Sequence, residues 1–180
     1  MKIVSKVIAI SMFMTGAAQA AQDGGAFAGL LQAADAVSVA AARVPAPADA
    51  EADRALASDV LDLSPNYADF LAGYAQSAGY KVFQLDGARM TAKPALLAYA
   101  TKELSLPGVP ENWDAMIDYL GDLPSIHRNN SILIVVRNSA RISGADGQLY
   151  GDLREVAEFA CRNARDWSKG VITIKFAFVP

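Results

Sequence analysis

Cysteine and histidine are almost missing from this sequence. Cys161 and His127 are the only residues of these two types among 180. A single cysteine excludes an internal disulfide, and a single histidine excludes the clusters of imidazole and thiolate ligands that zinc sites use. There is also no glycine-rich phosphate loop and no Gly-x-Ser-x-Gly nucleophile motif. We therefore expect packing to stabilise the fold, and we expect no metal, no cofactor and no enzymatic activity.

Long hydrophobic runs are missing too. Crossing a bilayer takes about 20 apolar residues in a helix, and the run Val7–Met14 is much shorter. It follows Lys2 and Lys6 and precedes the small-x-small sequence Ala18-Gln19-Ala20, an order typical of a secretory signal peptide. We expect cleavage after Ala20, a periplasmic or secreted bacterial protein, and no stable membrane insertion afterwards.

Basic side chains are outnumbered by acidic ones. Removing the two lysines of the signal peptide from 16 basic side chains leaves 14 against 19 acidic ones, a net charge of −5. Such a surface repels a phosphate-coated partner and attracts a basic one. The sequence therefore predicts no direct nucleic-acid binding.

Positive charge is absent altogether from residues 103–126, where five carboxylates occur: Glu103, Glu111, Asp114, Asp118 and Asp122. The last three are four residues apart, so a helix from about Asn112 to Gly121 stacks them along one side, while the apolar stripe that starts at Trp113 faces the core. Each like-charged pair at this spacing is unfavourable by a few tenths of a kcal/mol. Both a solvated acidic face and a binding surface are compatible with this pattern.

Strands and helices alternate in the second half of the chain. The runs KVFQLDG, SILIVVR and VITIKFAF predict three strands, and helical periodicity predicts helices over 93–104 and 149–166 between them. Strands separated by helices are typical of an α/β fold with a parallel sheet.

The first half is different. An alanine-rich stretch over 26–44 predicts a helix that ends before Pro45, and 45–53 reads as a solvated linker or helix–helix connection. A further helix is predicted over 64–79, with an aromatic face that includes Phe70 and packs on a neighbouring core or on a partner. Spacer, packed hairpin and lid over the acidic face all remain possible roles for residues 21–79.

The stretch KELSLPGVPENWDAMIDYL, together with KVFQLDG and VITI, resembles the barstar family of inhibitors of the ribonuclease barnase. The resemblance covers about residues 80–179. It implies an α/β fold with a three-stranded parallel sheet packed with helices. The expected organisation is then a signal peptide over 1–20, an alanine-rich helical extension and linker over 21–79, and a barstar-like domain over 80–180.

The resemblance also implies a mechanism, in which aspartates on one helix stand in for RNA phosphates in a cationic nuclease active site. Asp118 matches the central inhibitory aspartate of the family, and Asn112 and Asp114 match its contacts at the helix start. The complete set of expected partner-binding residues is Val109, Asn112, Asp114, Ile117, Asp118, Gly121 and Asp122. We therefore expect an exported inhibitor or immunity protein against a basic secreted ribonuclease, monomeric when free.

Some positions depart from the family pattern. The loop Gly108-Val109-Pro110 is one residue shorter and lacks the paired aromatics of the family, Ile117 and Leu123 stand where aromatic contacts are expected, and Arg162 or Arg165 falls near a glutamate contact. These departures favour an alternative, an exported acidic protein-binding module whose partner is no nuclease. A hydrolase is a third class, but we expect His127 to be exposed in a loop. Cys161 is compatible with a buried apolar residue as well as with a reactive thiol.

Overall fold

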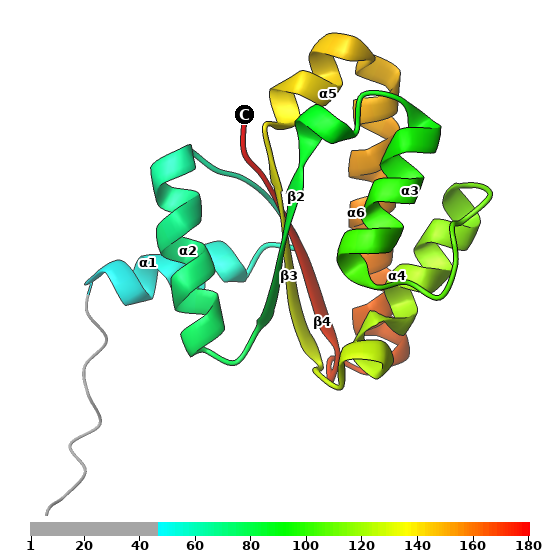
Figure 1. Cartoon of the computed structure of the whole chain (residues 1–180). Helices are drawn as coiled ribbons and strands as arrows, with labels where there is room; N and C mark the ends of the chain where they lie inside the picture. The colour runs from blue at the N-terminus through cyan, green and yellow to red at the C-terminus, as the bar shows by residue number, and fades with distance from the viewer. Residues whose placement is uncertain (1–46) are drawn as a thin grey trace, which may run out of the picture. The chain divides into compact units, whose positions relative to one another are not determined.

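A computed structural model describes residues 47–180, so the predicted signal peptide and the predicted helix over 26–44 lie outside the described residues. The described chain alternates helices and strands (Figure 1). In chain order the elements are α1 (Pro47–Leu56), β1 (Val60–Asp62), α2 (Pro65–Ser77), β2 (Lys81–Asp86), the 3-10 turn η1 (Gly87–Arg89), α3 (Lys93–Leu104), α4 (Trp113–His127), β3 (Ser131–Arg137), α5 (Ser139–Ala145), α6 (Gly147–Trp167) and β4 (Thr173–Phe178). None of these helices is long and apolar enough to span a membrane.

The strands form one parallel sheet in the order β1-β4-β3-β2, which confirms the predicted α/β class. The apolar strand β3 is central, with Ile134 paired to Phe83 on one side and to Phe176 on the other. The sheet has four strands rather than the three expected. The additional strand, β1, is only three residues long and pairs with β4, which is 116 residues away in sequence at Val60 and Phe176. Such a short strand has no local signature because its pairing partner is remote.

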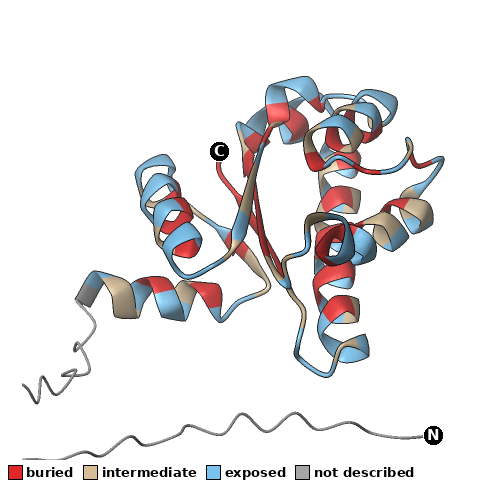
Figure 2. Ribbon diagram, turned by 60° about the horizontal axis from the view of Figure 1, so that its bottom comes forward, coloured by how far each residue is buried: buried red, intermediate tan, exposed pale blue. Residues whose placement is uncertain are grey.

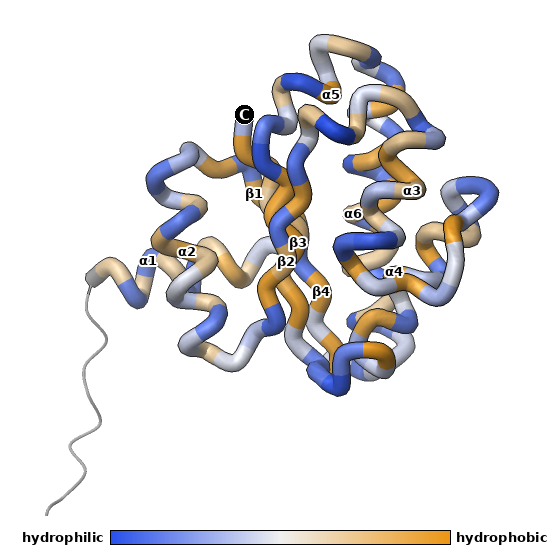
Figure 3. Tube along the Cα trace, in the orientation of Figure 1, coloured by the Kyte–Doolittle hydropathy of each residue, from blue (hydrophilic) through white to orange (hydrophobic). Residues whose placement is uncertain are grey.

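Two hydrophobic clusters cover the two faces of the sheet (Figures 1 and 2). Alternate residues of β3 divide between them: Ile132, Ile134 and Val136 join α3, α4 and α6, while Leu133 and Val135 join α1 and α2. Side chains point alternately to opposite faces of a strand, so a strand covered on both sides must be apolar throughout. Figure 3 shows the hydrophobic colour along β3.

The predicted linker over 45–53 is wrong from residue 47 onward, because α1 begins there. Alanine and glutamate are good helix formers, and Pro47 suits the first turn, where its missing N–H is not needed. Ala52 and Leu56 of α1 are buried, and Tyr74 of α2 donates a hydrogen bond to Asp53 at 2.6 Å. Tertiary packing therefore stabilises a segment too short and polar to be recognised as a helix by its sequence.

The aromatic face of α2 packs mainly on the sheet. Leu71 is fully buried, and Tyr67 and Tyr74 are partly buried against the same cluster, whereas Phe70 keeps 39% of its surface exposed. This cluster lies on the face of the sheet opposite α4. The described part of the extension is thus packed on the sheet, and it does not form a lid over the acidic helix.

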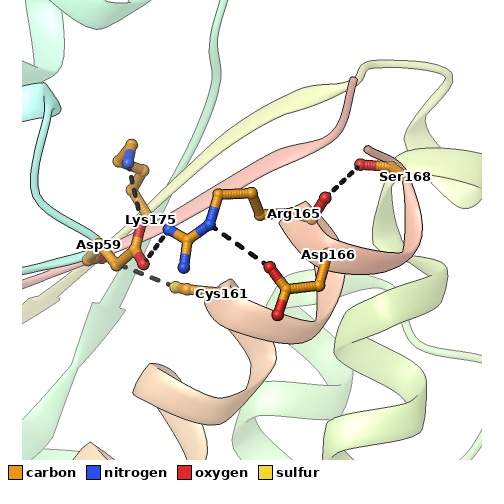
Figure 4. Close-up of polar contacts among 6 residues, drawn as sticks. All are labelled: Asp59, Cys161, Arg165, Asp166, Ser168 and Lys175. Carbon is orange, nitrogen blue, oxygen red and sulfur yellow. Dashed lines mark hydrogen bonds and ion pairs between the residues drawn. The ribbon is translucent and has the colours of Figure 1, made fainter. Parts of the chain in front are cut away.

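Asp59, just before β1, connects three elements through its carboxylate and its backbone (Figure 4). Its Oδ2 accepts a hydrogen bond from Arg165 of α6 at 2.5 Å, and its Oδ1 accepts one from Lys175 of β4 at 3.1 Å. The Asp59 carbonyl oxygen also accepts the N–H of Phe176 at 2.9 Å. Partial burial raises the pKa of Asp59, but the hydrogen bonds from Arg165 and Lys175 outweigh it and lower that pKa below its ordinary value.

Candidate functional site

The helix that carries the acidic row begins after a side-chain cap. Asn112 is extended and accepts a hydrogen bond through Oδ1 from the backbone N–H of Ala115 at 2.9 Å. This satisfies one of the N–H groups that the first turn leaves without a partner. Asp114 lies in that first turn, where the helix dipole favours an anion. Asn112 therefore has a structural role in addition to any contact with a partner.

The helix is longer than predicted. The sequence favoured an end near Gly121, but α4 continues through Pro124 to His127 and ends at Arg128 in the left-handed conformation, with φ 52°. Proline inside a helix removes one hydrogen bond, yet Leu123 and Pro124 are both buried, and this burial compensates for the lost bond. Gly121 is therefore a mid-helix residue and Asp122 belongs to the helix, so the acidic row is held rigid along its whole length.

The three aspartates of the row, Asp114, Asp118 and Asp122, are all exposed. On the opposite side Met116 and Leu120 are buried, at 3% and 1% exposure. Trp113 and Ile117, predicted to face the core as well, are only half buried and lie at its margin. The apolar side is what sets the rotation of α4, so the carboxylates face solvent as a consequence of core packing.

No aspartate of the row forms a salt bridge with any cation in residues 47–180. The ion pairs of the described chain lie elsewhere: Asp59 pairs with Arg165 and Lys175, Asp62 with Arg154, Asp69 with Arg137, and Asp166 with Arg165. No group of three or more possible metal ligands gathers within the same residues. The negative charge of the α4 row is therefore not neutralised by a salt bridge within residues 47–180, and it is accessible to a binding partner.

The loop before α4 presents little apolar surface. Leu106 and Pro110 are buried, while Pro107 and Val109 are exposed, Val109 at 58%. Thr101 of α3 lies 3.4 Å from the carbonyl oxygen of Gly108 and holds the loop close to the domain. Of the predicted partner-binding residues, Val109 is the one contributed by this loop, and the other six belong to α4 or its cap.

Two grooves run between α4 and α6 and share Ile117. One, of about 470 Å³, is lined on the α4 side by Asp118, Gly121 and Asp122 and on the α6 side by Trp167 and its neighbours. The other, of about 340 Å³, is lined on the α4 side by Trp113, Asp114 and Ile117 and on the α6 side by residues between Asp152 and Phe159. The predicted site residues of α4 are therefore joined by a second helix that the sequence reasoning did not include.

Sequence reasoning missed four residues on one side of α6 that line these grooves, of which three are exposed and Asn163 is half buried. They are Glu155, Phe159, Asn163 and Trp167. Phe159 and Trp167 are 41% and 87% exposed, which is unusual for aromatic side chains. A signal was present, because all four residues are spaced at i, i+4 and must share one side of a helix. Only the packing of α6 beside α4 shows that this side adjoins the acidic row.

A hydrogen bond ties α6 to the start of α4. Trp113 donates through Nε1 to Oδ2 of Asp152 at 3.0 Å, and Lys93 lies over the Trp113 ring at 4.7 Å from its centre. The acceptor side chain is half buried. This contact keeps the indole of Trp113 in place and fixes the spacing of the two helices near Asp114.

Both arginines expected near this surface contact other side chains. Arg165 pairs with Asp59 away from the grooves, and the guanidinium of Arg162 lies 5.3 Å from the ring centre of Phe159, which lines the smaller groove. Neither arginine lines either groove. The acidic character of the α4 side is therefore not cancelled by the α6 arginines.

His127 and Cys161 are held in structural positions. His127 was expected in an exposed loop, but it is the half-buried last residue of α4. Its Nε2 donates to the carbonyl oxygen of Leu104 at 2.8 Å, and its ring lies 4.7 Å from that of Phe83. Burial, with a smaller contribution from Asp59, raises the pKa of the Cys161 thiol to about 12, so the thiol stays protonated at neutral pH. Neither residue is placed as a nucleophile or base.

Comparisons with known proteins address the family. Among curated proteins none matches the chain. A solved structure of the ORC2 protein of Aeropyrum pernix, in ADPNP–ADP complexes, is similar with 16% identity and a TM-score of 0.48. The match covers 73% of this chain and only 40% of that one, and it carries no inference about activity. The family model of barstar, the barnase inhibitor, matches residues 80–176, from just before β2 into β4. This match spans more than half of the sequence and contains the whole acidic helix. The members of this family are not enzymes but inhibitors that bind a ribonuclease. The chain belongs to the barstar family.

Proposed function

We propose that this protein is an exported inhibitor of a basic ribonuclease and that α4 occupies the cationic active site of its target. The carboxylates of the row replace the phosphates of RNA. Asp118 lies at the centre of the row and makes the principal contact, with Asp114 and Asp122 on either side. Val109, Asn112, Ile117 and Gly121 complete the contact surface.

The observation that carries this proposal is the exposure of Asp118 without a cation to balance it. In the described chain, arginine and lysine side chains pair with Asp59, Asp62 and Asp69, and none pairs with the row. Each like-charged i, i+4 pair costs a few tenths of a kcal/mol in the free protein. An incoming cationic cleft relieves this repulsion, and it meets carboxylates that are already in place, so little order has to be created on binding.

The remaining charge of the protein acts at longer range. The net charge of −5 expected after signal cleavage attracts a basic partner, and complementary potentials raise association rates by about 10- to 1,000-fold over neutral pairs. This attraction is screened by salt, with a Debye length of about 8 Å at physiological ionic strength. This long-range attraction accounts for a high association rate and for discrimination between basic and acidic partners, and it does not set a particular affinity.

The test is a titration of the mature protein into assays of several basic secreted ribonucleases, barnase among them. We expect stoichiometric inhibition of at least one enzyme, competitive with RNA and weakened by salt. An acidic ribonuclease of similar size is the control and should keep its full activity. If every basic ribonuclease in the panel remains active at a large excess of the protein, the proposed function is wrong.

Export is the second part of the proposal. It rests on the order of basic, apolar and small residues at the start of the sequence, and it predicts a mature protein that begins at Ala21. Mass spectrometry of the protein recovered from the periplasm or medium of a bacterial host measures this directly. An intact chain confined to the cytoplasm would contradict export and leave the inhibitor proposal standing.

One observation favours a different partner. The loop before α4 exposes Val109 but has no aromatic side chain, whereas aromatic anchors often dominate the energy of an interface. An acidic module that binds a non-nuclease protein accommodates this departure. In that case the ribonuclease panel shows no inhibition, and a substitution of Asp118 affects no nuclease assay.

A further inference from the structure

The groove of about 470 Å³ between α4 and α6 has two unlike walls. The α4 wall carries the carboxylates of Asp118 and Asp122, and the α6 wall carries the indole of Trp167, which is 87% exposed. The rest of the lining includes Ala160 and Ala164, which are both buried, together with the polar residues Asn163 and Ser168. The volume falls within the range of about 300–1,000 Å³ that is typical of ligand pockets.

Gly121 adds to the space on the α4 side. It lies between the two aspartates on the same helix, and a side chain at this position would meet no atom within 4 Å. The groove is therefore open along its α4 wall. Its volume of about 470 Å³ is large enough for a single side chain.

The combination of these walls selects one chemistry. The guanidinium of arginine is planar, bonds carboxylates through two parallel N–H groups, and stacks on aromatic faces. Its aliphatic stem packs on apolar surface while the charged end stays near water. Lysine has the positive charge but lacks the planar group with two parallel N–H donors. An apolar side chain would make no hydrogen bond or ion pair with the carboxylates.

We propose that this groove receives an arginine side chain of the partner, held between the carboxylates of Asp118 and Asp122 and the indole of Trp167. The inference rests on the proposed function, in which a basic protein docks on α4. It deepens that function by placing the aromatic anchor on α6. The loop before α4, by contrast, has no aromatic side chain to offer.

The probe is acetyl-arginine amide, titrated at millimolar concentration while the protein is followed by ¹H–¹⁵N NMR. The chain has two tryptophans, so two indole N–H signals are expected, and the signal that disappears in Trp167→Ala identifies the residue. Trp113 lines the other groove and its Nε1 is bonded to Asp152, so its signal shows whether binding is confined to the groove beside Trp167. We expect saturable shifts of the Trp167 indole and of the amides of Asp118 and Asp122, with little change at Trp113.

Acetyl-citrulline amide is the matched ligand control, since it has the shape of arginine without the charge. We expect it to bind at least about two- to fivefold more weakly, the range of a cation–π contact at an exposed site. Trp167→Ala and Asp118→Asn should each weaken arginine binding by about the same factor, read at the Asp122 amide. Phe70→Ala, which removes an exposed aromatic from the other face of the sheet, should change nothing.

The inference is overturned if the arginine shifts are no larger at Trp167 than at Trp113, or if citrulline produces the same shifts. This outcome leaves the proposed function intact, provided that ribonuclease inhibition still depends on Asp118. Conversely, arginine binding in the groove without inhibition of any ribonuclease overturns the proposed function and keeps the groove as an arginine site for another basic protein.

Discussion

Replacing Asp118 with alanine weakens inhibition of a sensitive basic ribonuclease by at least about 30-fold, which corresponds to the loss of about 2 kcal/mol that marks an interface hot spot. Asp118 lies at the centre of the exposed row and is not paired with any described cation. Without its carboxylate, the cationic groups of the target stay desolvated and unbalanced. The inhibition constant of the purified variant, measured at two salt concentrations, gives both the size and the electrostatic share of the effect.

The same substitution has an opposite effect on folding. Asp118 is exposed and has like charges at Asp114 and Asp122, so its removal leaves the free energy of unfolding unchanged or raises it by a few tenths of a kcal/mol. Urea denaturation measures this. Glu158→Ala is the matched control, because it removes the same charge from an exposed position of α6 that lines neither groove. Equal inhibition by the two variants would mean that α4 has no special role.

Asp59→Ala lowers the free energy of unfolding by about 3–5 kcal/mol, the range found when one partner of a buried ion pair is removed. Lys175 is 6% exposed and would be left as an unbalanced charge inside the sheet. We expect a value toward the lower end, because the side chain of Asp59 remains 27% exposed. Combining the change with Lys175→Met removes the buried charge and should restore most of the lost stability.

The control for Asp59 is Asp166→Ala. The carboxylate of Asp166 lies 3.7 Å from Arg165, which also pairs with Asp59. The Asp166 side chain is 62% exposed, so its removal lowers the free energy of unfolding by about 0–1 kcal/mol. If Asp166→Ala lowers the free energy of unfolding as much as Asp59→Ala does, then the effect comes from Arg165, which has lost a carboxylate partner, and not from the buried Lys175. Chemical denaturation of the variants in one buffer separates these cases.

The contribution of Asp59 also depends on pH in a defined direction. Its pKa is lowered in the folded state, so its stabilising effect is complete above the ordinary value of 3.8 and is lost as the pH falls through the lower folded value. The difference in unfolding free energy between the natural protein and Asp59→Asn should therefore be largest near neutral pH and shrink in acid. A difference that is constant across this range would contradict the assignment.

Local patterns were sufficient for much of the fold. Helix 93–104 and strand 131–137 were predicted with the bounds that the structure has, because the helix has a clear periodicity and the strand is a continuous apolar, β-branched run. Predictions failed where stability comes from remote contacts. α1 was read as a linker, β1 was not recognised, and α4 was ended too early at Gly121 because its continuation depends on the burial of Pro124.

For the site, the sequence by itself determined the acidic row: carboxylates at i, i+4 beside an apolar stripe must face away from the core, because helix geometry is local. The tertiary structure alone decided that no described cation neutralises Asp118 and that Trp167 lies across a groove from it. The partner of a charged side chain can lie far away in the sequence, as Asp59 and Lys175 do over 116 residues. The tertiary structure therefore determines which charged side chains remain unpaired and accessible to a partner, and a local sequence pattern does not predict this.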